Sequence, residues 1–139
     1  MGTAPRIEAA SAEQAQAVFA RLLAFNQAAS GHSLDDHPLR RIIRDDAGQL
    51  RAGLVAEVCG GWLMVHALWV EPAHRGQGLG QALLADAEGQ ARALGAHAAM
   101  LDTFSWQAEG FYLRQGYTVF GRLAGFPPGH QRIYLHKPL

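Results

Sequence analysis

A glycine-rich turn at residues 75–80, Arg-Gly-Gln-Gly-Leu-Gly, constrains the fold of this chain more than any other segment. The run before it, 62–70, is short and apolar, as a buried strand is. The run after it, 79–94, repeats apolar residues about every 3.6 positions until Gly95, as an amphipathic helix does. A further short apolar run at 97–102 completes a strand–helix–strand unit, which should be right-handed and lie at the centre of a sheet with its two strands parallel.

The rest of the pattern predicts an α+β fold with a mixed sheet. A helix is expected from Ser11 to about residue 29, with Ser11 as its N-cap and Gly31 as its stop, followed by a loop over 31–38. Further strands are expected over 40–45, 49–58, 117–121 and 131–136, with a short helix over 107–115. A chain of 139 residues without an internal repeat is expected to form a single domain, 1–139.

Charge and composition argue against several classes of protein. Twelve Lys and Arg residues balance twelve Asp and Glu residues, so no overall field favours nucleic acid or an anionic membrane as a partner. The longest apolar stretch, 62–70, is interrupted by His66 and is far shorter than the roughly 20 residues needed to cross a bilayer. The single cysteine, Cys59, and an N-terminus without a signal-peptide pattern predict a cytoplasmic protein.

The glycine turn predicts a phosphate or pyrophosphate site. Backbone N–H groups and the positive end of the helix dipole converge there, glycines at 78 and 80 let a ligand approach them, and Arg75 can add a charge-assisted contact. The alternative is a turn that needs glycines only for its own conformation. A P-loop is excluded because no Gly-Lys-Ser/Thr follows, and the dinucleotide fingerprint fails because Gln81 and Leu83 stand where it needs a small residue.

The segment from about Trp62 to Tyr117 resembles the core of the GCN5-related N-acetyltransferase (GNAT) superfamily. The acetyl-CoA signature of that family, Arg/Gln-x-x-Gly-x-Gly/Ala, is matched by Arg75, Gly78 and Gly80. The downstream family run, Ala-x-x-hydrophobic-Tyr-x-x-x-Gly-aromatic, is matched by Ala108, Phe111, Tyr112, Gly116 and Tyr117. The resemblance implies a GNAT-like acyl-CoA N-acyltransferase fold, a mixed, mostly antiparallel twisted sheet with helices on both faces, whose central strands 62–70 and 97–102 splay around the pantetheine arm.

The resemblance also implies acetyl-CoA as co-substrate and no metal. The residues expected to contact acetyl-CoA are Leu68, Trp69, Val70, Arg75, Gly76, Gln77, Gly78, Leu79, Gly80, Ser105 and Tyr112. Ser105 stands where many members carry Asn, and a role as a helix N-cap is the alternative for it. The loop at 31–38 holds His32, Asp35, Asp36 and His37 without a recognised metal-ligand spacing, and the resemblance places this region at the acceptor pocket.

Acetyl transfer from a thioester to an amine needs a proton acceptor, a donor to the developing oxyanion and a proton for the departing thiolate. The resemblance places Tyr112 near the sulfur as general acid, and a phenol with a pKa of about 10 stays protonated at neutral pH. Without the resemblance, Tyr112 would be interpreted as a core residue packed on the helix 79–94. Backbone N–H groups near Trp69 or Val70 are candidate oxyanion donors.

His66 is the candidate general base, because an imidazole with a pKa of about 6.5 accepts a proton at neutral pH. A satisfied core histidine is the alternative, and Glu71 and Asp102 are further candidates for the base. Together these residues predict an N-acetyltransferase that moves the acetyl group of acetyl-CoA to a primary amine of a small molecule or peptide by direct attack. A non-catalytic acyl-CoA sensor or interaction module is the alternative function, and dimeric family members leave a homodimer open.

Overall fold

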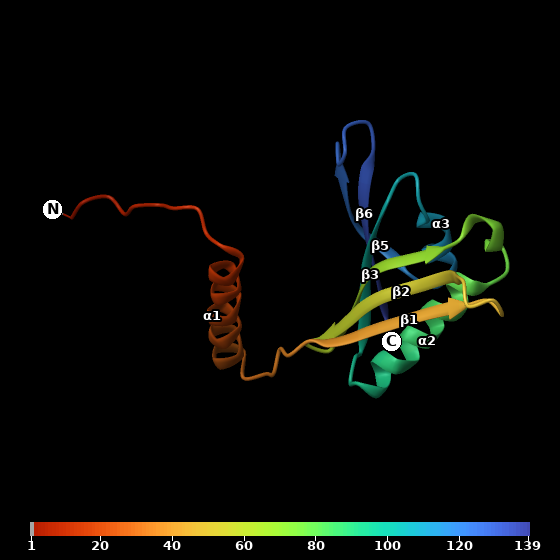
Figure 1. Ribbon diagram of the computed structural model, residues 1–139, viewed down its shortest axis with the longest axis horizontal. Coiled ribbons are helices and arrows are strands. Elements are labelled where there is room, and N and C mark those ends of the chain that lie inside the picture. The colour runs from red at the N-terminus through yellow and green to blue at the C-terminus, as the bar shows by residue number, and fades with distance from the viewer. Residues whose placement is uncertain (1) are drawn as a thin grey trace. The chain divides into compact units, whose positions relative to one another are not determined.

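The computed structural model describes residues 2–139, which form three α-helices, one short 3-10 helix and six strands (Figure 1). The helices are α1 (Ala12–Ser30), η1 (Pro72–His74), α2 (Leu79–Ala93) and α3 (Glu109–Arg114). The strands are β1 (His37–Arg44), β2 (Leu50–Cys59), β3 (Trp62–Val70), β4 (Ala98–Phe104), β5 (Thr118–Ala124) and β6 (Gln131–Pro138). The chain divides into two compact units, one that ends at Leu34 and contains α1, and one that spans Asp35–Leu139.

The helix of the first unit begins and ends where its capping residues predict. Ser11 Oγ accepts a hydrogen bond from the Gln14 backbone N–H at 3.1 Å, and the Gln14 side chain accepts one from the Ser11 N–H at 2.9 Å. This reciprocal pair is a capping box, which satisfies two donors of the helix start. Gly31 adopts a left-handed φ of 74° and ends the helix.

The second unit is built on a six-stranded sheet in the order β1-β2-β3-β4-β6-β5. All neighbours are antiparallel except β3 and β4, which are parallel, so the predicted mixed and mostly antiparallel sheet is confirmed. The β3–β4 pairing runs only from Trp62↔Ala98 to Val65↔Leu101, although β3 continues to Val70 and β4 to Phe104. The two central strands therefore diverge over their second halves, as the resemblance implied.

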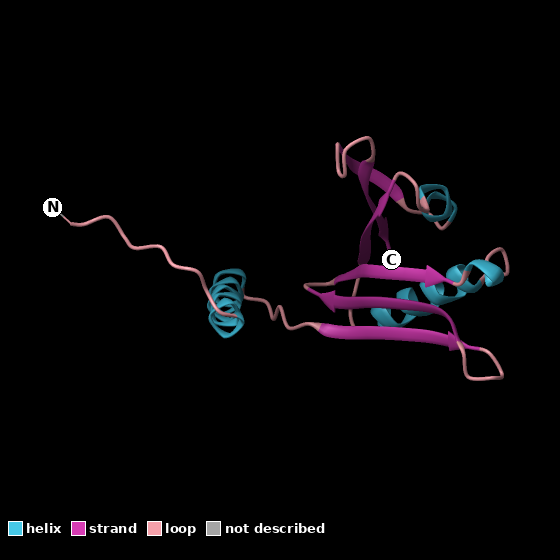
Figure 2. Cartoon of the chain, turned by 45° about the horizontal axis from the view of Figure 1, so that its top comes forward, coloured by secondary structure: helices cyan, strands magenta, loops and turns pink. Residues whose placement is uncertain are grey.

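Helix α2 covers one face of β1, β2 and β3 (Figure 2). Its buried side chains recur at helical spacing and include three small or branched apolar residues, Leu84, Ala87 and Ala91. In β2 every second residue faces this helix, which makes Ala52, Leu54, Ala56 and Val58 the buried set. The intervening residue Glu57 consequently points away from the α2 face.

A β-bulge in β3 changes the side on which His66 lies. The register shifts between Val55, which pairs with Ala67, and Ala56, which pairs with Val65, so His66 is the extra residue. Simple alternation from Leu68 and Val70 would place His66 on the α2 face. Instead its Nε2 contacts the Glu57 carboxylate at 3.0 Å and its side chain is 54% exposed, so the alternative of a core histidine is wrong.

Several element boundaries differ from the prediction for identifiable reasons. Strand β1 begins at His37, inside the expected loop, because His37 and the residues that follow pair with β2 from Val58 onward. Helix α3 begins at Glu109 rather than at 107, because the Gln107 side chain accepts a hydrogen bond from the Phe104 N–H at 2.9 Å and closes a turn. No helix within residues 2–139 is long and apolar enough to cross a membrane.

Candidate active site

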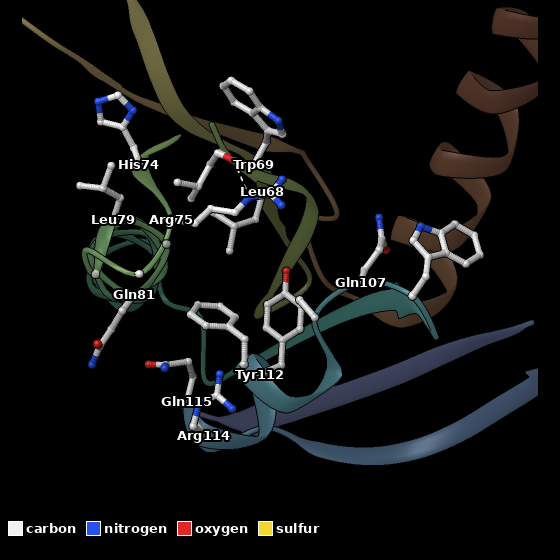
Figure 3. A pocket seen from close by; sticks show the side chains of 17 residues that line it. Leu68, Trp69, His74, Arg75, Leu79, Gln81, Gln107, Tyr112, Arg114 and Gln115 are labelled. Atoms are coloured by element: carbon white, nitrogen blue, oxygen red, sulfur yellow. Dashed lines mark hydrogen bonds between the residues drawn. The ribbon is translucent and has the colours of Figure 1, made fainter. Parts of the chain in front are cut away.

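A pocket of about 720 Å³ opens where β3 and β4 diverge (Figure 3). The end of β3 forms one wall, the turn before α2 forms a second, and the segment 106–115, which includes α3, forms the third. Figure 3 labels a side chain from each wall, Trp69 of β3, Leu79 at the turn and Tyr112 of α3. The volume is within the range of about 300–1,000 Å³ that small-ligand sites occupy.

The glycine turn presents an open helix N-terminus to this pocket. Gly76 and Gly78 have φ values of +79° and +80°, a region that side chains rarely adopt, and a Cβ added at either position would meet no atom within 4 Å. Gly78 is the N-cap of α2, and no side chain of the described residues caps this end. The first N–H groups of α2 therefore have neither an intrahelical acceptor nor a side-chain cap, and such groups form an anion site.

Arg75 and Gly80 fix the shape of the turn. Arg75 Nε donates to the Val70 carbonyl at 3.0 Å and ties the turn to the end of β3, while the two terminal nitrogens of its guanidinium provide further donors. A Cβ at Gly80 would lie 3.4 Å from Phe111 Cζ, so glycine there lets α2 and α3 approach closely. Gly80 therefore has a packing role in addition to the predicted ligand role.

Tyr112 lies in the wall formed by α3 and is 7% exposed. Its ring makes edge contacts with Phe111 at 5.1 Å and Tyr117 at 5.9 Å between centroids. Burial, followed by the negative charge of Asp102, raises the pKa of Tyr112 to about 12. The hydroxyl is therefore protonated throughout the neutral range and serves as a donor.

Tyr112 also belongs to the buried core, as the alternative interpretation expected, and Tyr117 is its neighbour there. The Tyr117 hydroxyl donates to the buried carboxylate of Glu88 on α2 at 2.8 Å, and Lys137 Nζ donates to the same carboxylate at 3.0 Å. Burial and the Glu88 carboxylate together raise the pKa of Tyr117. This network joins the segment after α3 to α2 and β6, which holds Tyr112 in place.

The candidate bases have different surroundings. His66 lies one residue beyond the last β3–β4 pair, is 54% exposed at its side chain, and contacts the Glu57 carboxylate. Asp102 accepts a hydrogen bond from Arg132 Nε at 2.8 Å, and Glu71 forms an ion pair with Arg51. Both carboxylates thus pair with arginines. His66 instead contacts the carboxylate of Glu57, at the point where β3 and β4 begin to diverge.

Nine of the residues expected to contact acetyl-CoA line the pocket: Leu68, Trp69, Val70, Arg75, Gly76, Gly78, Leu79, Gly80 and Tyr112. Gln77 and Ser105 are not among its lining residues. Ser105 Oγ instead accepts a hydrogen bond from the Gln131 N–H at 3.1 Å and contacts His130 Nδ1 at 3.2 Å. Ser105 was predicted either to contact the cofactor or to cap a helix. It does not line the pocket, and the N-cap of α3 is Ala108.

The sequence interpretation did not single out the pocket residues His74, Gln81, Trp106, Arg114 and Gln115. Trp106 carried a usable signal, because it lies two residues before Ala108, where the family-like run begins. The others have no pattern of their own and reach the pocket through the positions of η1, α2 and α3. Within residues 2–139 no group of three or more His, Cys, Asp or Glu residues is placed to hold a metal ion.

Comparisons with known proteins agree with this geometry. A family model described as Acetyltransferase (GNAT) family matches residues 6–117. An acetyltransferase of Agrobacterium fabrum is 38% identical over 130 residues, which cover 94% of each chain. The blasticidin-S acetyltransferase of Streptomyces morookaense is 42% identical over 95 residues, 68% of this chain and 70% of that protein. A crystal structure of an acetyltransferase from Bacillus cereus superposes with a TM-score of 0.90 at 25% identity, over 97% of this chain and 98% of the other. The chain belongs to the GNAT family of acetyltransferases.

Proposed function

We propose that this chain uses acetyl-CoA to acetylate a primary amine of a small molecule or peptide, by direct attack of the amine on the thioester. One observation carries the proposal. The open N-terminus of α2 lines the same pocket as Tyr112, whose hydroxyl is protonated at neutral pH. The first suits a pyrophosphate and the second suits a departing thiolate. The pocket therefore has a feature for each end of an acyl-CoA pantetheine arm.

Acetyl-CoA fits the residues that line this pocket. The pyrophosphate would bind the N–H groups after Gly76 and Gly78, where open space faces the backbone, with Arg75 as an additional donor. Beyond Val65, β3 has no paired strand on its β4 side among the described residues. Its N–H groups on that edge can therefore bind the pantetheine amide and the thioester oxygen near Trp69 and Val70. Acetyl-CoA itself supplies an activated acyl group.

His66 is the proposed proton acceptor for the amine, directly or through a water molecule. His66 is not among the residues that line the pocket; it lies one residue beyond the last β3–β4 pair, and Glu57 contacts its Nε2. The proposal requires the amine or a bridging water molecule to reach the imidazole from the pocket. A carboxylate next to an imidazole orients the ring and stabilises the imidazolium that proton transfer creates. Glu57 is accordingly a positioning residue for His66.

Tyr112 is the proposed donor to the thiolate. The nitrogen–carbon bond forms as the carbon–sulfur bond breaks, the amine proton goes to His66, and the sulfur accepts a hydrogen bond from the Tyr112 hydroxyl. With a pKa of about 12, Tyr112 holds its proton more tightly than a thiol whose pKa is about 8.5. Its contribution is thus a hydrogen bond that stabilises the leaving thiolate, while Tyr112 keeps its own proton.

The acceptor is proposed to be a small molecule, since a relative that shares 42% identity over 95 residues bears the name of one, blasticidin S. The first experiment measures acetyl-CoA binding by calorimetry for the wild type and for Gly78→Asp, whose carboxylate would repel the pyrophosphate. We expect micromolar binding by the wild type and a loss of at least about 100-fold in the variant. A folded wild type that does not bind acetyl-CoA would overturn the proposal.

Two control variants separate charge from backbone strain. Gly78→Asn places a neutral side chain of the same size at the left-handed φ of +80° and should weaken binding far less than Asp. Gly89→Asp adds the same charge to an exposed position of α2, outside the pocket lining, and should bind acetyl-CoA as the wild type does. Thiol release with a panel of primary amines then distinguishes an acetyltransferase from a non-catalytic acyl-CoA sensor.

A further inference from the structure

Aromatic side chains gather at one end of the pocket, around Trp106. The Trp106 and Phe104 rings stack with centroids 4.7 Å apart and planes at 8°, and the His130 ring meets Trp106 edge-on at 4.8 Å. Phe126 from the β5–β6 turn contacts Phe104 at 5.9 Å. We name this group, Phe104, Trp106, Phe126 and His130, the aromatic platform. Trp106 is its member in the pocket lining and is 54% exposed.

The platform lies at the end of the pocket away from the glycine turn. In Figure 3, Tyr112 lies between the α2 residues Leu79 and Gln81, which adjoin the turn, on one side and Gln107, the neighbour of Trp106, on the other. An acyl-CoA that places its pyrophosphate on the turn and its sulfur at Tyr112 therefore ends before Trp106. The space beside the indole is then left for the acceptor rather than for the acetyl donor.

The indole is held rigidly although half of it is exposed. One face is covered by Phe104, and His130, which meets the ring edge-on, is fixed by its contact with Ser105 Oγ at 3.2 Å. Arg132 lies over the rings of Phe104 at 5.7 Å and Phe126 at 4.9 Å, and Asp102 holds the Arg132 side chain. A flat apolar surface that is already ordered binds a second flat ring without the usual loss of side-chain entropy.

Charges around the platform are paired with one another. Arg132 forms its ion pair with Asp102, and Glu109, at the start of α3, forms one with Arg122. Such pairs leave little net field to attract a polycation to the exposed indole face. Stacking is then the dominant attraction that this end of the pocket offers to an acceptor.

We infer that the acceptor carries its amine close to a planar aromatic or heteroaromatic ring, which stacks on Trp106. This inference rests on the proposed acetyl-CoA-dependent function and adds the chemical class of the acceptor. The ring lies against the exposed face of the indole while its amine reaches the thioester carbon near Tyr112. Trp106 is consequently a specificity-determining residue that Phe104 and His130 support.

The test compares two acceptors with the same ethylamine chain, 2-phenylethylamine, whose ring is flat and aromatic, and 2-cyclohexylethylamine, whose ring is puckered and saturated. Thiol release from acetyl-CoA gives kcat/KM for each, and the ratio of the two values is the quantity measured. We expect the wild type to favour the aromatic amine by about three- to tenfold, the range of one aromatic pair. Trp106→Leu should bring the ratio to about one, and Trp106→Phe should keep part of the preference.

Phe120→Leu is the matched control, because Phe120 is an equally exposed aromatic residue on β5 that does not line the pocket. It should leave the ratio unchanged. The inference is overturned if the wild-type ratio of kcat/KM values is near one, or if Trp106→Leu keeps the wild-type ratio. It is also overturned if a wider amine panel shows that amines without a ring are the best acceptors. Failure to acetylate any panel amine overturns the proposed function instead and removes the basis of the inference with it.

Discussion

At the scale of single residues, His66 and Glu57 form the pair whose chemistry is most directly testable. His66→Gln removes the proton acceptor but keeps a polar side chain, and we expect kcat/KM at pH 7 to fall by about 100-fold. Glu57→Gln should lower kcat by roughly tenfold while the KM for acetyl-CoA stays the same, since Glu57 acts only on the orientation of His66.

Steady-state kinetics by thiol release across pH 5–9 provides the measurement for both variants. Asp86→Asn serves as a control, since this carboxylate on α2 pairs with Arg41 and lies outside the pocket lining. It should keep the wild-type profile. If His66→Gln retains full turnover, His66 is not the base and water or another group accepts the proton.

Tyr112 should also make stability depend on alkaline pH. Its pKa is raised from an ordinary value of 10.0 to about 12 by burial and by Asp102. Below pH 10 both folded and unfolded chains keep the proton, so the full stability is present. Between about pH 10 and 12 only the unfolded chain loses the proton, and the free energy of unfolding falls, by up to about 2.7 kcal/mol for two pKa units.

Urea unfolding at pH 9 and pH 11 for the wild type and Tyr112→Phe measures this contribution. The variant lacks the ionisable hydroxyl, so its free energy of unfolding should decrease less between the two pH values. Tyr134→Phe is a suitable comparison, because Tyr134 is only partly buried. An identical decrease in the wild type and Tyr112→Phe would contradict the raised pKa of Tyr112.

At the scale of elements, the Tyr117–Glu88–Lys137 network joins three segments that are far apart in the sequence. Glu88 on α2 is 6% exposed and accepts hydrogen bonds from both Tyr117, which follows α3, and Lys137 on β6. Lys137→Met removes the cation and leaves a buried carboxylate without its charge partner. Breaking such a pair costs about 3–5 kcal/mol when fully buried, and we expect roughly 2–4 kcal/mol because Lys137 keeps some exposure.

Urea denaturation of Lys137→Met gives this loss directly. The double variant Glu88→Gln/Lys137→Met removes the charge from both partners and should recover more than half of the lost stability. A double variant that is less stable than Lys137→Met would show that the carboxylate is stabilised by Tyr117 rather than by the cation. Acetyl-CoA affinity in the folded fraction reports whether α3 keeps its place.

Elements that carry local signals could be predicted from the sequence, and those set by distant pairing could not. Ser11 and Gly31 mark the ends of α1 through their own backbone and side-chain preferences. The bulge at His66 has no local signature, because it arises from the register of β2 against β3. Ser105 likewise contacts residues 130 and 131, which no sequence spacing relates to it.

At the scale of the whole molecule, the position of the site follows from topology. The crossover from β3 through α2 to β4 places a helix N-terminus beside the end of β3, and the early end of the β3–β4 pairing opens the sheet there. The glycine turn and the parallel pair were both predictable, since each rests on general rules of chain connection. The aromatic platform was not, because it joins the end of β4 to the β5–β6 turn through long-range contacts.

Because the site joins β3, α2 and α3, acetyl-CoA should stabilise the folded chain as a whole. A ligand that binds only the folded state adds a free energy of about 2.7 kcal/mol at 100 times its dissociation constant. For a chain of this length the midpoint of thermal unfolding should then rise by several degrees. Differential scanning calorimetry at increasing acetyl-CoA concentration measures the rise, which should grow with the logarithm of concentration once the site is saturated.

The same titration on Gly78→Asp and Gly89→Asp separates binding at the turn from a general effect of the ligand on the medium. Gly89→Asp should show the wild-type rise, whereas Gly78→Asp should show almost none, because its carboxylate stands where the pyrophosphate has to approach the N–H groups of α2. Equal rises in both variants would place the bound ligand away from the glycine turn. Since every contact proposed for acetyl-CoA starts from that turn, the positions assigned to Tyr112 and Trp106 along the pocket would then have no support from binding.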